Sequence, residues 1–528
     1  DEDDEDDEDD EDDEDDDEDG SGTLVDTVNK LIEKRDRKFV IESRKAFVKF
    51  INEEFFVSLI EKSNDMGEAN NIKLHQLFSK EYLSSDTPYN GLLIYHGLGT
   101  GKTATSIITV EGLSDDMNIN VLLPASLETE YINEVKSWGE ERFNINKNIW
   151  VFVSEEDYNK KKKYYKKKYS ITDELINYSF NSTRSKIRSK IFNSKDNIES
   201  TKDELDELYK DQIQELKKYR GFFFPPKDIS KHDEIYISDK YNKPIDDYKG
   251  KINKKLHSDI ELVYLDSQID YLVQAKYNFI HYNGWPNISK ASDDEETFDI
   301  NEILNPEQAD KRKTDNQLIA QKLIKNLKKN QKENINSPFK NEVIVIDEIH
   351  NLINMINNKK PNAIQFYNWI KDSEDTKKIF LSGTPIVNQP SEIALLFNMI
   401  KGRQHIYNFT IKTDDNIVKL ETELKKIFYT SRSSIEQLHI SKNKGRIVIS
   451  FIKNKTNFES ILDTETNIIK TVKFNGNTDS MFFEQIYRGL YKKFDKRLIL
   501  PNETELKNSI NKLKDKEFIF DKDADIVF

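Results

Sequence analysis

Five short, largely apolar runs stand out along the chain, each bounded by polar or glycine-containing segments. They are GLLIY at 91–95, NVLLPA at 120–125, YNFIHY at 277–282, EVIVID at 342–347 and KIFLSG at 378–383. Runs of this kind are typical of strands that are buried on both faces of a parallel sheet. Because helical patterns separate them, the sequence predicts an α/β domain with a doubly wound parallel sheet and helices on both faces.

A helical pattern precedes the first of these runs. Between Thr27 and Lys62, apolar residues recur at helical spacing, which predicts one or two amphipathic helices. The residues that carry this pattern are Val28, Leu31, Ile32, Phe47, Phe50, Ile51 and Phe55.

A long polar segment, roughly 155–270, separates the second run from the third. Its stretch DELDELYKDQIQELKKY at 203–219 has helical charge pairing, so we expect a mainly helical insertion that protrudes from the sheet. The insertion opens with lysines and tyrosines between Lys160 and Tyr169. Such a run can contact phosphates and stack on bases, but it is also typical of a solvated helix face in a lysine-rich chain. The sequence leaves both interpretations open.

Charge is distributed very unevenly along the 528 residues. The net charge is −16, but residues 1–19 are all Asp or Glu, and the remaining chain has 77 acidic against 80 basic side chains. A block of like charges repels itself and buries nothing, so we expect 1–22 to be a disordered acidic tail. A tail that also shields a basic groove or mimics nucleic acid is the alternative. The 30 Phe and 23 Tyr elsewhere supply enough apolar surface for a folded core.

Cysteine is absent, which excludes disulfides and thiolate metal sites. No apolar run approaches the roughly 18 residues of a membrane span, and no secretory pattern precedes residue 30. From these features we expect a soluble intracellular protein.

The stretch YHGLGTGKTAT at 95–105 resembles a phosphate-binding loop, with His96 where the strict motif has its first glycine. Glycines allow consecutive backbone N–H groups to curl around phosphate oxygens at a helix N-terminus. We expect Lys102 to neutralise β- and γ-phosphate charge, and the Thr103 hydroxyl to ligate Mg²⁺. The candidate cradle residues are Gly97, Leu98, Gly99, Thr100, Gly101, Lys102, Thr103 and Ala104.

Two further pieces follow predicted strands. In VIVIDEIH at 343–350, Asp347 is expected to hold Mg²⁺, Glu348 to orient or deprotonate the attacking water, and His350 to relay to the third piece. That piece is LSGTP at 381–385, in which the hydroxyls of Ser382 and Thr384 can bond acids or histidines at neighbouring strand ends. Taken alone, LSGTP is only a turn.

The order of these motifs resembles a known family. HGLGTGKT, PASL at 124–127, DEIH and SGTPIVN at 382–388 are similar to motifs I, Ia, II and III of superfamily two helicases of the Swi/Snf-like branch. Three longer stretches, TPYNGLLIYHGLGTGKT from Thr87, YNFIHYNG from Tyr277 and SPFKNEVIVIDEIHNLI from Ser337, narrow the resemblance. They resemble the poxvirus-type nucleoside triphosphatase and the early transcription factor helicase subunit of large nucleocytoplasmic DNA viruses. The resemblance covers roughly residues 70–460 and implies a RecA-like fold, ATP and Mg²⁺ as cofactors, and DNA-dependent ATP hydrolysis in viral transcription.

The resemblance also implies roles for residues outside the three pieces. Gln76 resembles the glutamine that reads adenine ahead of motif I, although an exposed helical glutamine is an equal alternative. The segments PASL and YNG resemble parts of the family that lie near DNA. The expected DNA contacts are therefore Pro124, Ala125, Ser126, Leu127, Tyr282, Asn283 and Gly284.

The chain departs from the family pattern after residue 400. Such motors use a second RecA-like lobe with arginines in a Q-x-x-G-R-x-x-R type motif, and no such motif occurs here. KGRIVISFIKN at 444–454 resembles the segment that connects the lobes. We therefore expect a helical segment at 23–69, a RecA-like ATPase lobe at 70–405, and a connecting region with the start of a second lobe at 406–528. The second lobe is expected to be incomplete or truncated.

Two functions from different classes follow from these expectations. The first is an ATP-dependent DNA helicase or translocase of viral transcription, here mainly its first motor lobe, located in the virion or in the host cytoplasm. Its expected partners are duplex DNA and a viral RNA polymerase or transcription factor subunit. The alternative is an ATP-gated module that binds DNA or polymerase without motor activity, which the missing arginines favour.

Overall fold

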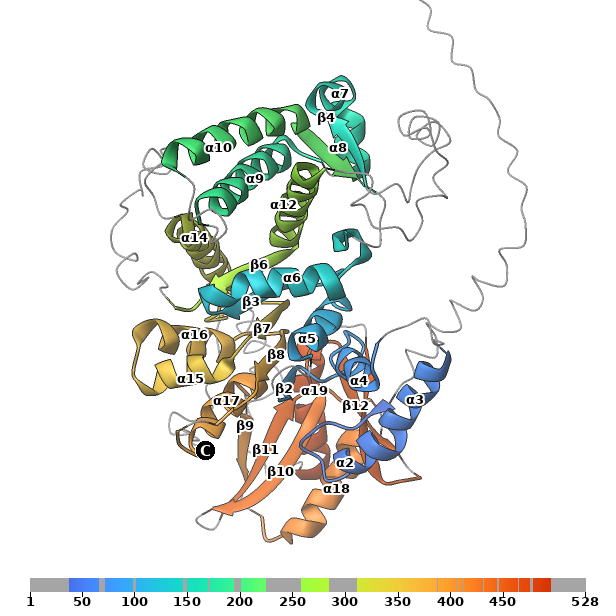
Figure 1. Cartoon of the computed structure of the whole chain (residues 1–528). Helices are drawn as coiled ribbons and strands as arrows, with labels where there is room; N and C mark the ends of the chain where they lie inside the picture. Colours follow the sequence, from blue (N-terminus) through green and yellow to red (C-terminus); the bar gives the residue numbers. More distant parts are fainter. Residues whose placement is uncertain are drawn as a thin grey trace, which may run out of the picture. The chain divides into compact units, whose positions relative to one another are not determined.

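The structure of the chain is a computed structural model (Figure 1). It describes residues 38–65, 72–97, 101–145, 150–169, 171–193, 201–224, 258–283, 311–386, 388–404, 406–411, 413–430, 432–443, 446–463, 465–474 and 478–494. These residues form two compact units, one made of 38–51, 86–88 and 406–494 and the other of 52–85 and 89–404. The predicted tail at 1–22 and the helical positions Val28, Leu31 and Ile32 lie outside the described residues.

A five-stranded parallel sheet forms the centre of the larger unit, as the sequence predicted. The strands, in their order across the sheet, are β2 (Gly91–Tyr95), β8 (Lys377–Ser382), β7 (Glu342–Ile346), β3 (Asn118–Leu123) and β6 (Tyr277–His281). All neighbouring pairs are parallel, and each of the five apolar runs contributes one strand. This is a RecA-like α/β arrangement, and the predicted fold class is confirmed.

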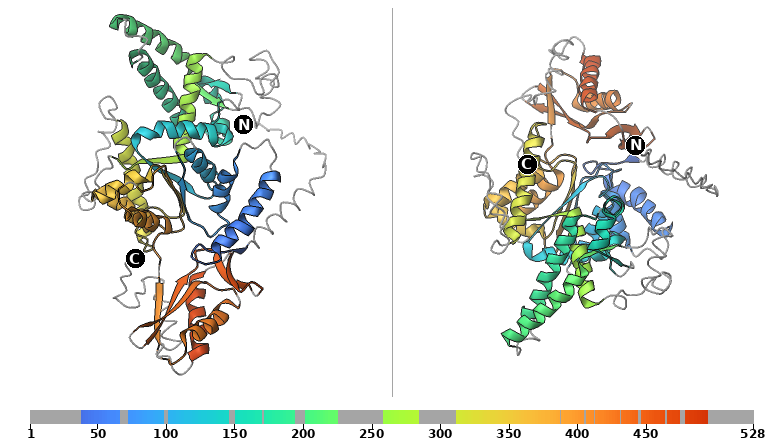
Figure 2. Two further views of the ribbon diagram at one scale, coloured as in Figure 1. Left: turned by 60° about the horizontal axis from the view of Figure 1, so that its bottom comes forward. Right: turned by 90° about the horizontal axis from the view of Figure 1, so that it is seen from above.

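Helices cover both faces of this sheet. The connections from β2 to β3 and from β3 to β6 run in one direction across the sheet, and those from β6 to β7 and β8 run back. Right-handed crossovers therefore place the two sets of connecting helices on opposite faces. Figure 2 shows this arrangement, with α5 (Lys102–Glu111) and α6 (Glu128–Trp138) on one face and α15 (Ile349–Asn357) and α16 (Pro361–Lys371) on the other.

Large apolar side chains pack between the sheet and the helices on the face covered by α15 and α16. Phe339, Phe366 and Phe380 are fully buried in a cluster that also contains residues of α14 (Lys311–Gln331) and α17 (Glu392–Lys401).

The helical region before β2 consists of a single turn of α-helix, α2 (Phe47–Phe50), a π-helical turn at Ile51–Phe55, α3 (Phe56–Asp65) and α4 (Leu74–Tyr82).

The predicted insertion is largely helical and extends from the sheet (Figure 1). Its strands β4 (Val151–Ser154) and β5 (Gly221–Phe224) form an antiparallel ribbon. Its helices are α7 (Glu155–Lys160), α8 (Lys162–Tyr169), α9 (Asp173–Asn193), α10 (Lys202–Leu216) and α12 (Asp259–Lys276), the last of which leads directly into β6.

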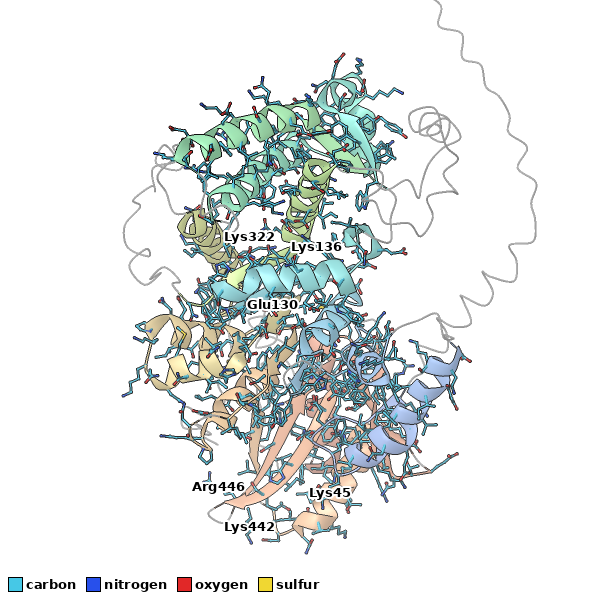
Figure 3. The ribbon with its side chains drawn as sticks, viewed as in Figure 1. Lys45, Glu130, Lys136, Lys322, Lys442 and Arg446 are labelled. Atoms are coloured by element: carbon cyan, nitrogen blue, oxygen red, sulfur yellow. The ribbon has the colours of Figure 1, made fainter. Side chains whose placement is uncertain are left out.

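A network of four charged side chains joins the insertion to α6. Lys136 on α6 lies 2.5 Å from Asp266 and 2.6 Å from Asp270, both on α12. Lys186 on α9 approaches the same two carboxylates at 2.5 and 2.7 Å. Three helices are therefore tied together at one point, and Lys136 is labelled there in Figure 3.

The smaller unit has a different architecture. Its strands β9 (Ile406–Ile411), β10 (Ile435–Asn443) and β11 (Arg446–Lys453) form one antiparallel sheet. A second antiparallel sheet contains β1 (Lys38–Phe39), β12 (Phe458–Asp463) and β13 (Ile468–Lys473). The helices α18 (Ile417–Tyr429) and α19 (Thr478–Phe494) contribute Leu424, Phe482 and Leu490 to the core.

The described strands between 406 and 494 thus pair only in antiparallel fashion, whereas a RecA-like lobe has a parallel sheet. The segment expected to connect two lobes, 444–454, contains β11. Residues 495–528, the rest of the range assigned to the start of a second lobe, lie outside the described residues. None of the helices in the described ranges is both long and apolar enough to cross a bilayer.

Candidate nucleotide site

The three sequence motifs meet at the carboxyl edge of the parallel sheet. β8 lies between β2 and β7 in the sheet. The SGTP segment, which follows β8, therefore lies between the GKT segment after β2 and the DEIH segment after β7. The register pairs Tyr95 with Ser382 and Ile346 with Phe380. Since all strands run the same way, GKT, DEIH and SGTP come together at one edge.

The helix after β2 begins directly at the candidate phosphate loop. Gly101 has φ +82°, a left-handed conformation that favours glycine, and its carbonyl accepts the first helical bond from Thr105 N–H. Lys102 is the first residue of α5 and is buried except for 9% of its surface. Its Nζ lies 3.5 Å from the point that a Cβ on Gly383 would occupy, so it reaches toward SGTP. Leu98, Gly99 and Thr100 lie outside the described residues.

Asp347 follows β7 and is almost completely buried. Its Oδ1 accepts a hydrogen bond from Glu348 N–H at 2.9 Å. Burial, reinforced by the negative charge of Glu348, raises the pKa of Asp347 to about 6, although this N–H and Lys102 act in the opposite direction. A buried carboxylate with this excess of negative surroundings is stabilised by a cation.

Glu348 stands in a strained turn between β7 and α15. Its φ is +48° and its ψ +53°, values that non-glycine residues rarely adopt. The turn leaves the Glu348 side chain partly exposed, with Oε2 3.2 Å from Nδ1 of His350. The same Nδ1 lies 3.1 Å from Ser382 Oγ, which accepts a hydrogen bond from Thr384 N–H at 3.0 Å.

These contacts link DEIH to SGTP as a chain from Glu348 through His350 to Ser382. With its hydrogen on Nδ1, His350 can donate to Glu348 Oε2 or to Ser382 Oγ, which also accepts from Thr384 N–H. The side chain of Thr384 is exposed, and its contribution in the structure is through its backbone N–H.

Gln76 lies in the same site, near the start of α4. It is 97% buried, and its Oε1 accepts from Lys73 N–H at 2.9 Å. A Cβ placed on Gly101 would lie 4.0 Å from its Nε2. The alternative of an exposed helical glutamine is therefore excluded.

A cavity of about 490 Å³ is lined by Gln76, Lys102, Asp347 and Glu348, whereas the predicted site residues His350, Ser382 and Thr384 are not among its lining residues. Its volume falls in the range of small-molecule sites, roughly 300–1,000 Å³. The lining residues are Lys73, Gln76, Gly101, Lys102, Thr103, Ala104, Leu127, Glu130, Tyr131, Glu134, Trp138, Asp347 and Glu348. Of the described residues predicted to form the cradle, only Gly97, exposed at the end of β2, is not among them.

One wall of the cavity comes from α6, which the sequence interpretation missed. Its lining residues are Glu130, Tyr131, Glu134 and Trp138; Glu130, Glu134 and Trp138 follow at spacings of four residues and Tyr131 precedes Glu134 by three, so they share one face. The Tyr131 hydroxyl is 3.1 Å from Ser106 Oγ and fixes α6 against α5. The sequence signal that could have indicated this wall is the spacing of these residues directly after PASL. Figure 3 labels Glu130 on this helix.

The residues expected near DNA occupy two strand ends of the same edge. Pro124 is buried after β3, and Ala125–Leu127 forms a 3₁₀ turn that exposes Ser126. Tyr282 after β6 is fully buried, and its hydroxyl donates to the carbonyl oxygens of Asp347 and Glu348 at 3.3 and 3.4 Å. Burial raises the pKa of this hydroxyl, so it remains a donor. Asn283 is exposed, and Gly284 lies outside the described residues.

Thus the structure gives the Tyr282 side chain a supporting contact to the DEIH turn. Because the Tyr282 side chain is fully buried, the structure does not support a direct contact between this side chain and DNA. The expected DNA contacts of the other residues stay predictions.

Comparison with known proteins gives similarity over short segments. Over 65 residues the chain is 42% identical to a putative ATP-dependent RNA helicase of Acanthamoeba polyphaga mimivirus, covering 12% of this chain and 11% of that protein. Over 132 residues it is 30% identical to a termination factor NPH-I homolog of African swine fever virus, covering 24% of this chain and 17% of that protein. A second putative ATP-dependent RNA helicase of the mimivirus is 37% identical over 71 residues, covering 13% of this chain and 9% of that protein.

The matched segments therefore span between 9% and 17% of the length of these curated relatives. No family model matches the chain, and no solved structure matches it. Together with the RecA-like sheet, the similarities support a viral helicase family and a helicase or nucleoside triphosphatase role.

Proposed function

We propose that the chain belongs to an ATP-dependent DNA helicase or translocase that acts in viral transcription, and that it contains mainly the first motor lobe. One observation carries this proposal: Lys102 at the start of α5, and Asp347 and Glu348 after β7, line one cavity at the carboxyl edge of a parallel sheet. This is the arrangement that holds a nucleoside triphosphate and aligns its hydrolysis.

The residues present fit a magnesium nucleotide. Asp347 is buried and its pKa is raised, so a divalent cation relieves an existing electrostatic cost. Thr103 lines the same cavity from the first turn of α5. In the described part of the chain, no group of three or more His, Cys, Asp or Glu side chains forms a complete metal site. Mg²⁺ commonly shares its ligands with substrate phosphates, as this arrangement requires.

In the proposed mechanism, Lys102 and the N-terminus of α5 bind the phosphates. Mg²⁺, when bound through Thr103 and Asp347, neutralises phosphate charge. Glu348 orients the attacking water, and His350 and Ser382 hold Glu348 in register with SGTP. The buried amide of Gln76 reads the base: its Nε2 donates, and its Oε1, which accepts from Lys73 N–H, has a second lone pair that can also accept.

Nucleic acid is proposed to bind along the same edge, near Ser126 and Asn283. Both residues are exposed: Ser126 follows β3, which neighbours β7, and Asn283 follows β6, which lies on the other side of β3. Tyr282 connects this region to the carbonyls of the DEIH turn, which offers a route between nucleic acid and hydrolysis. A viral polymerase or transcription factor subunit is the proposed protein partner, and the virion or host cytoplasm the proposed location.

The second candidate function is an ATP-gated module that binds DNA or polymerase without motor activity. The antiparallel pairing of the described strands at 406–494 favours it, because a second RecA-like lobe is not formed by these residues. Absence of an arginine finger reduces turnover by about 10³- to 10⁵-fold in nucleoside triphosphatases that use one.

ATP hydrolysis measured with and without duplex DNA distinguishes the two functions. The motor predicts stimulation by DNA of about tenfold or more, whereas the ATP-gated module predicts tight ATP binding with negligible turnover under both conditions. Lys102→Ala should abolish the activity, and Lys325→Ala, an exposed lysine of α14, is the matched control. Activity that survives Lys102→Ala contradicts both functions.

A further inference from the structure

We propose that the outer surface of α8 is a second nucleic-acid contact that binds single strands. This surface, called the α8 face, consists of Lys163, Tyr164, Lys166 and Lys167. All four side chains are exposed, and Tyr164 retains 40% of its surface. The proposal concerns the insertion rather than the edge of the parallel sheet, and it does not depend on the nucleotide site.

The inner side of α8 is anchored, which holds the α8 face outward. Tyr165 packs edge-on against Phe222 of β5, with ring centres 5.1 Å apart, and Tyr158 of α7 packs on the same ring at 5.8 Å. Lys162 pairs with Asp173 at 2.6 Å. Among the described contacts, Tyr165 therefore fixes the helix to the β4–β5 ribbon and Lys162 fixes it to α9, while the ring of Tyr164 meets that of Tyr165 edge-on at 5.3 Å.

Spacing along the helix brings the three lysines close together. Lys166 and Lys167 follow Lys163 by three and four residues, so their side chains are neighbours on the helix surface. Tyr164 lies one turn from Lys167 and beside them. An exposed aromatic ring next to several ammonium groups is the combination that stacks on an unpaired base and contacts its phosphates.

Nearby acids do not neutralise this surface. α8 itself contains no Asp or Glu. Glu156 and Asp157 pair with Lys160, and Glu155 pairs with Arg220. Within the ranges that the structure describes, no ion pair involves Lys163, Lys166 or Lys167.

The exposed tyrosine favours single strands over duplex. Bases in a duplex are stacked on each other and do not offer a face to Tyr164, whereas unpaired bases do. Sequence preference is not expected, since every base has a face on which a ring can stack.

The test measures binding of a fluorescein-labelled oligothymidylate to the full chain, by anisotropy and without nucleotide, over a series of salt concentrations. The variant Lys163→Gln, Lys166→Gln, Lys167→Gln should weaken binding at least about tenfold. It should also lower the slope of log Kd against log salt by about 2, since each single-strand phosphate contact contributes about 0.7. The matched control, Lys202→Gln, Lys217→Gln, Lys218→Gln, removes equal charge from exposed positions in and after α10 of the same insertion.

A second variant, Tyr164→Leu, isolates the aromatic contact without changing charge. It should weaken binding of the single strand about tenfold, given a contribution of roughly 1–3 kcal/mol per stacked base, and leave duplex binding unchanged. Equal affinities for the α8 and α10 triple variants overturn the proposal. So does a Tyr164→Leu variant that binds the single strand as the unaltered chain does.

Discussion

Asp347 is a residue of the site whose pKa is strongly shifted by burial and by the charges around it. Burial first, and the charge of Glu348 second, raise its pKa from 3.8 to about 6. Ionisation of this carboxyl is therefore less favourable in the folded protein than in the unfolded chain, and this difference lowers the free energy of unfolding wherever the group is ionised. This cost is absent below pH 3.8, grows between pH 3.8 and about 6, and is complete above pH 6.

Asp347→Asn should remove that cost while keeping the oxygen that accepts from Glu348 N–H. In the absence of Mg²⁺ and nucleotide, we expect the variant to be more stable than the unaltered protein at pH 8, by on the order of 2 kcal/mol. The gain should vanish near pH 4. Denaturant unfolding at both pH values checks this, and an equal effect at pH 4 and pH 8 argues against the assigned environment.

Glu348 offers a separate test at the same scale. Glu348→Gln keeps the side-chain shape and the left-handed turn but removes the charge that orients water. ATP binding should persist while hydrolysis falls by about 10²-fold or more, in line with the usual contribution of a general base. Turnover at the unaltered rate, measured alongside the affinity, rules out this role.

At the residue scale the sequence predicted which residues come together at the site but not the environment of each. The motifs identified Lys102, Asp347 and Glu348, because their spacing after apolar runs is diagnostic of strand ends. The burial of Gln76 and Tyr282 depends on packing between segments that are distant in the chain, and single-residue patterns do not contain that information.

Among the secondary-structure elements, α6 connects the candidate site to the insertion. One side of this helix contributes Glu130, Glu134 and Trp138 to the cavity, while Lys136 enters the ion network with α9 and α12. A displacement of α6 by bound nucleotide would therefore be transmitted to the insertion.

Lys136→Ala should loosen this junction. Lys136 is nearly buried, and its loss leaves Asp266 and Asp270 to share Lys186 alone. We expect unfolding to become easier by about 1–3 kcal/mol, since one partner of a partly buried group is left uncompensated. Lys160→Ala, which removes an exposed pair, should have no measurable effect in the same thermal unfolding experiment.

The elements differ in how far the sequence predicted them. All five parallel strands follow from apolar runs, because strands buried on both faces need no alternation. β11 was interpreted as a connecting segment, although its alternating burial is typical of an antiparallel strand with one exposed face. The spacing of Glu130, Glu134 and Trp138 indicated a common face of α6, but that this face lines the cavity depends on how the helix packs across α5.

On the scale of the whole molecule, the chain combines a RecA-like unit with an antiparallel unit of separate core. The similarity to viral helicases covers short segments, so the proposed motor function depends mainly on the geometry of the site. The central claim is that one cavity binds a magnesium nucleotide through Lys102.

Calorimetric titration of the full chain with ATP and Mg²⁺ tests this claim most directly. We predict one site per chain, a loss of affinity of at least about tenfold in Lys102→Ala, and unchanged affinity in Lys325→Ala. Equal ATP affinity in Lys102→Ala and the unaltered protein, or no binding by the unaltered protein, would contradict the account.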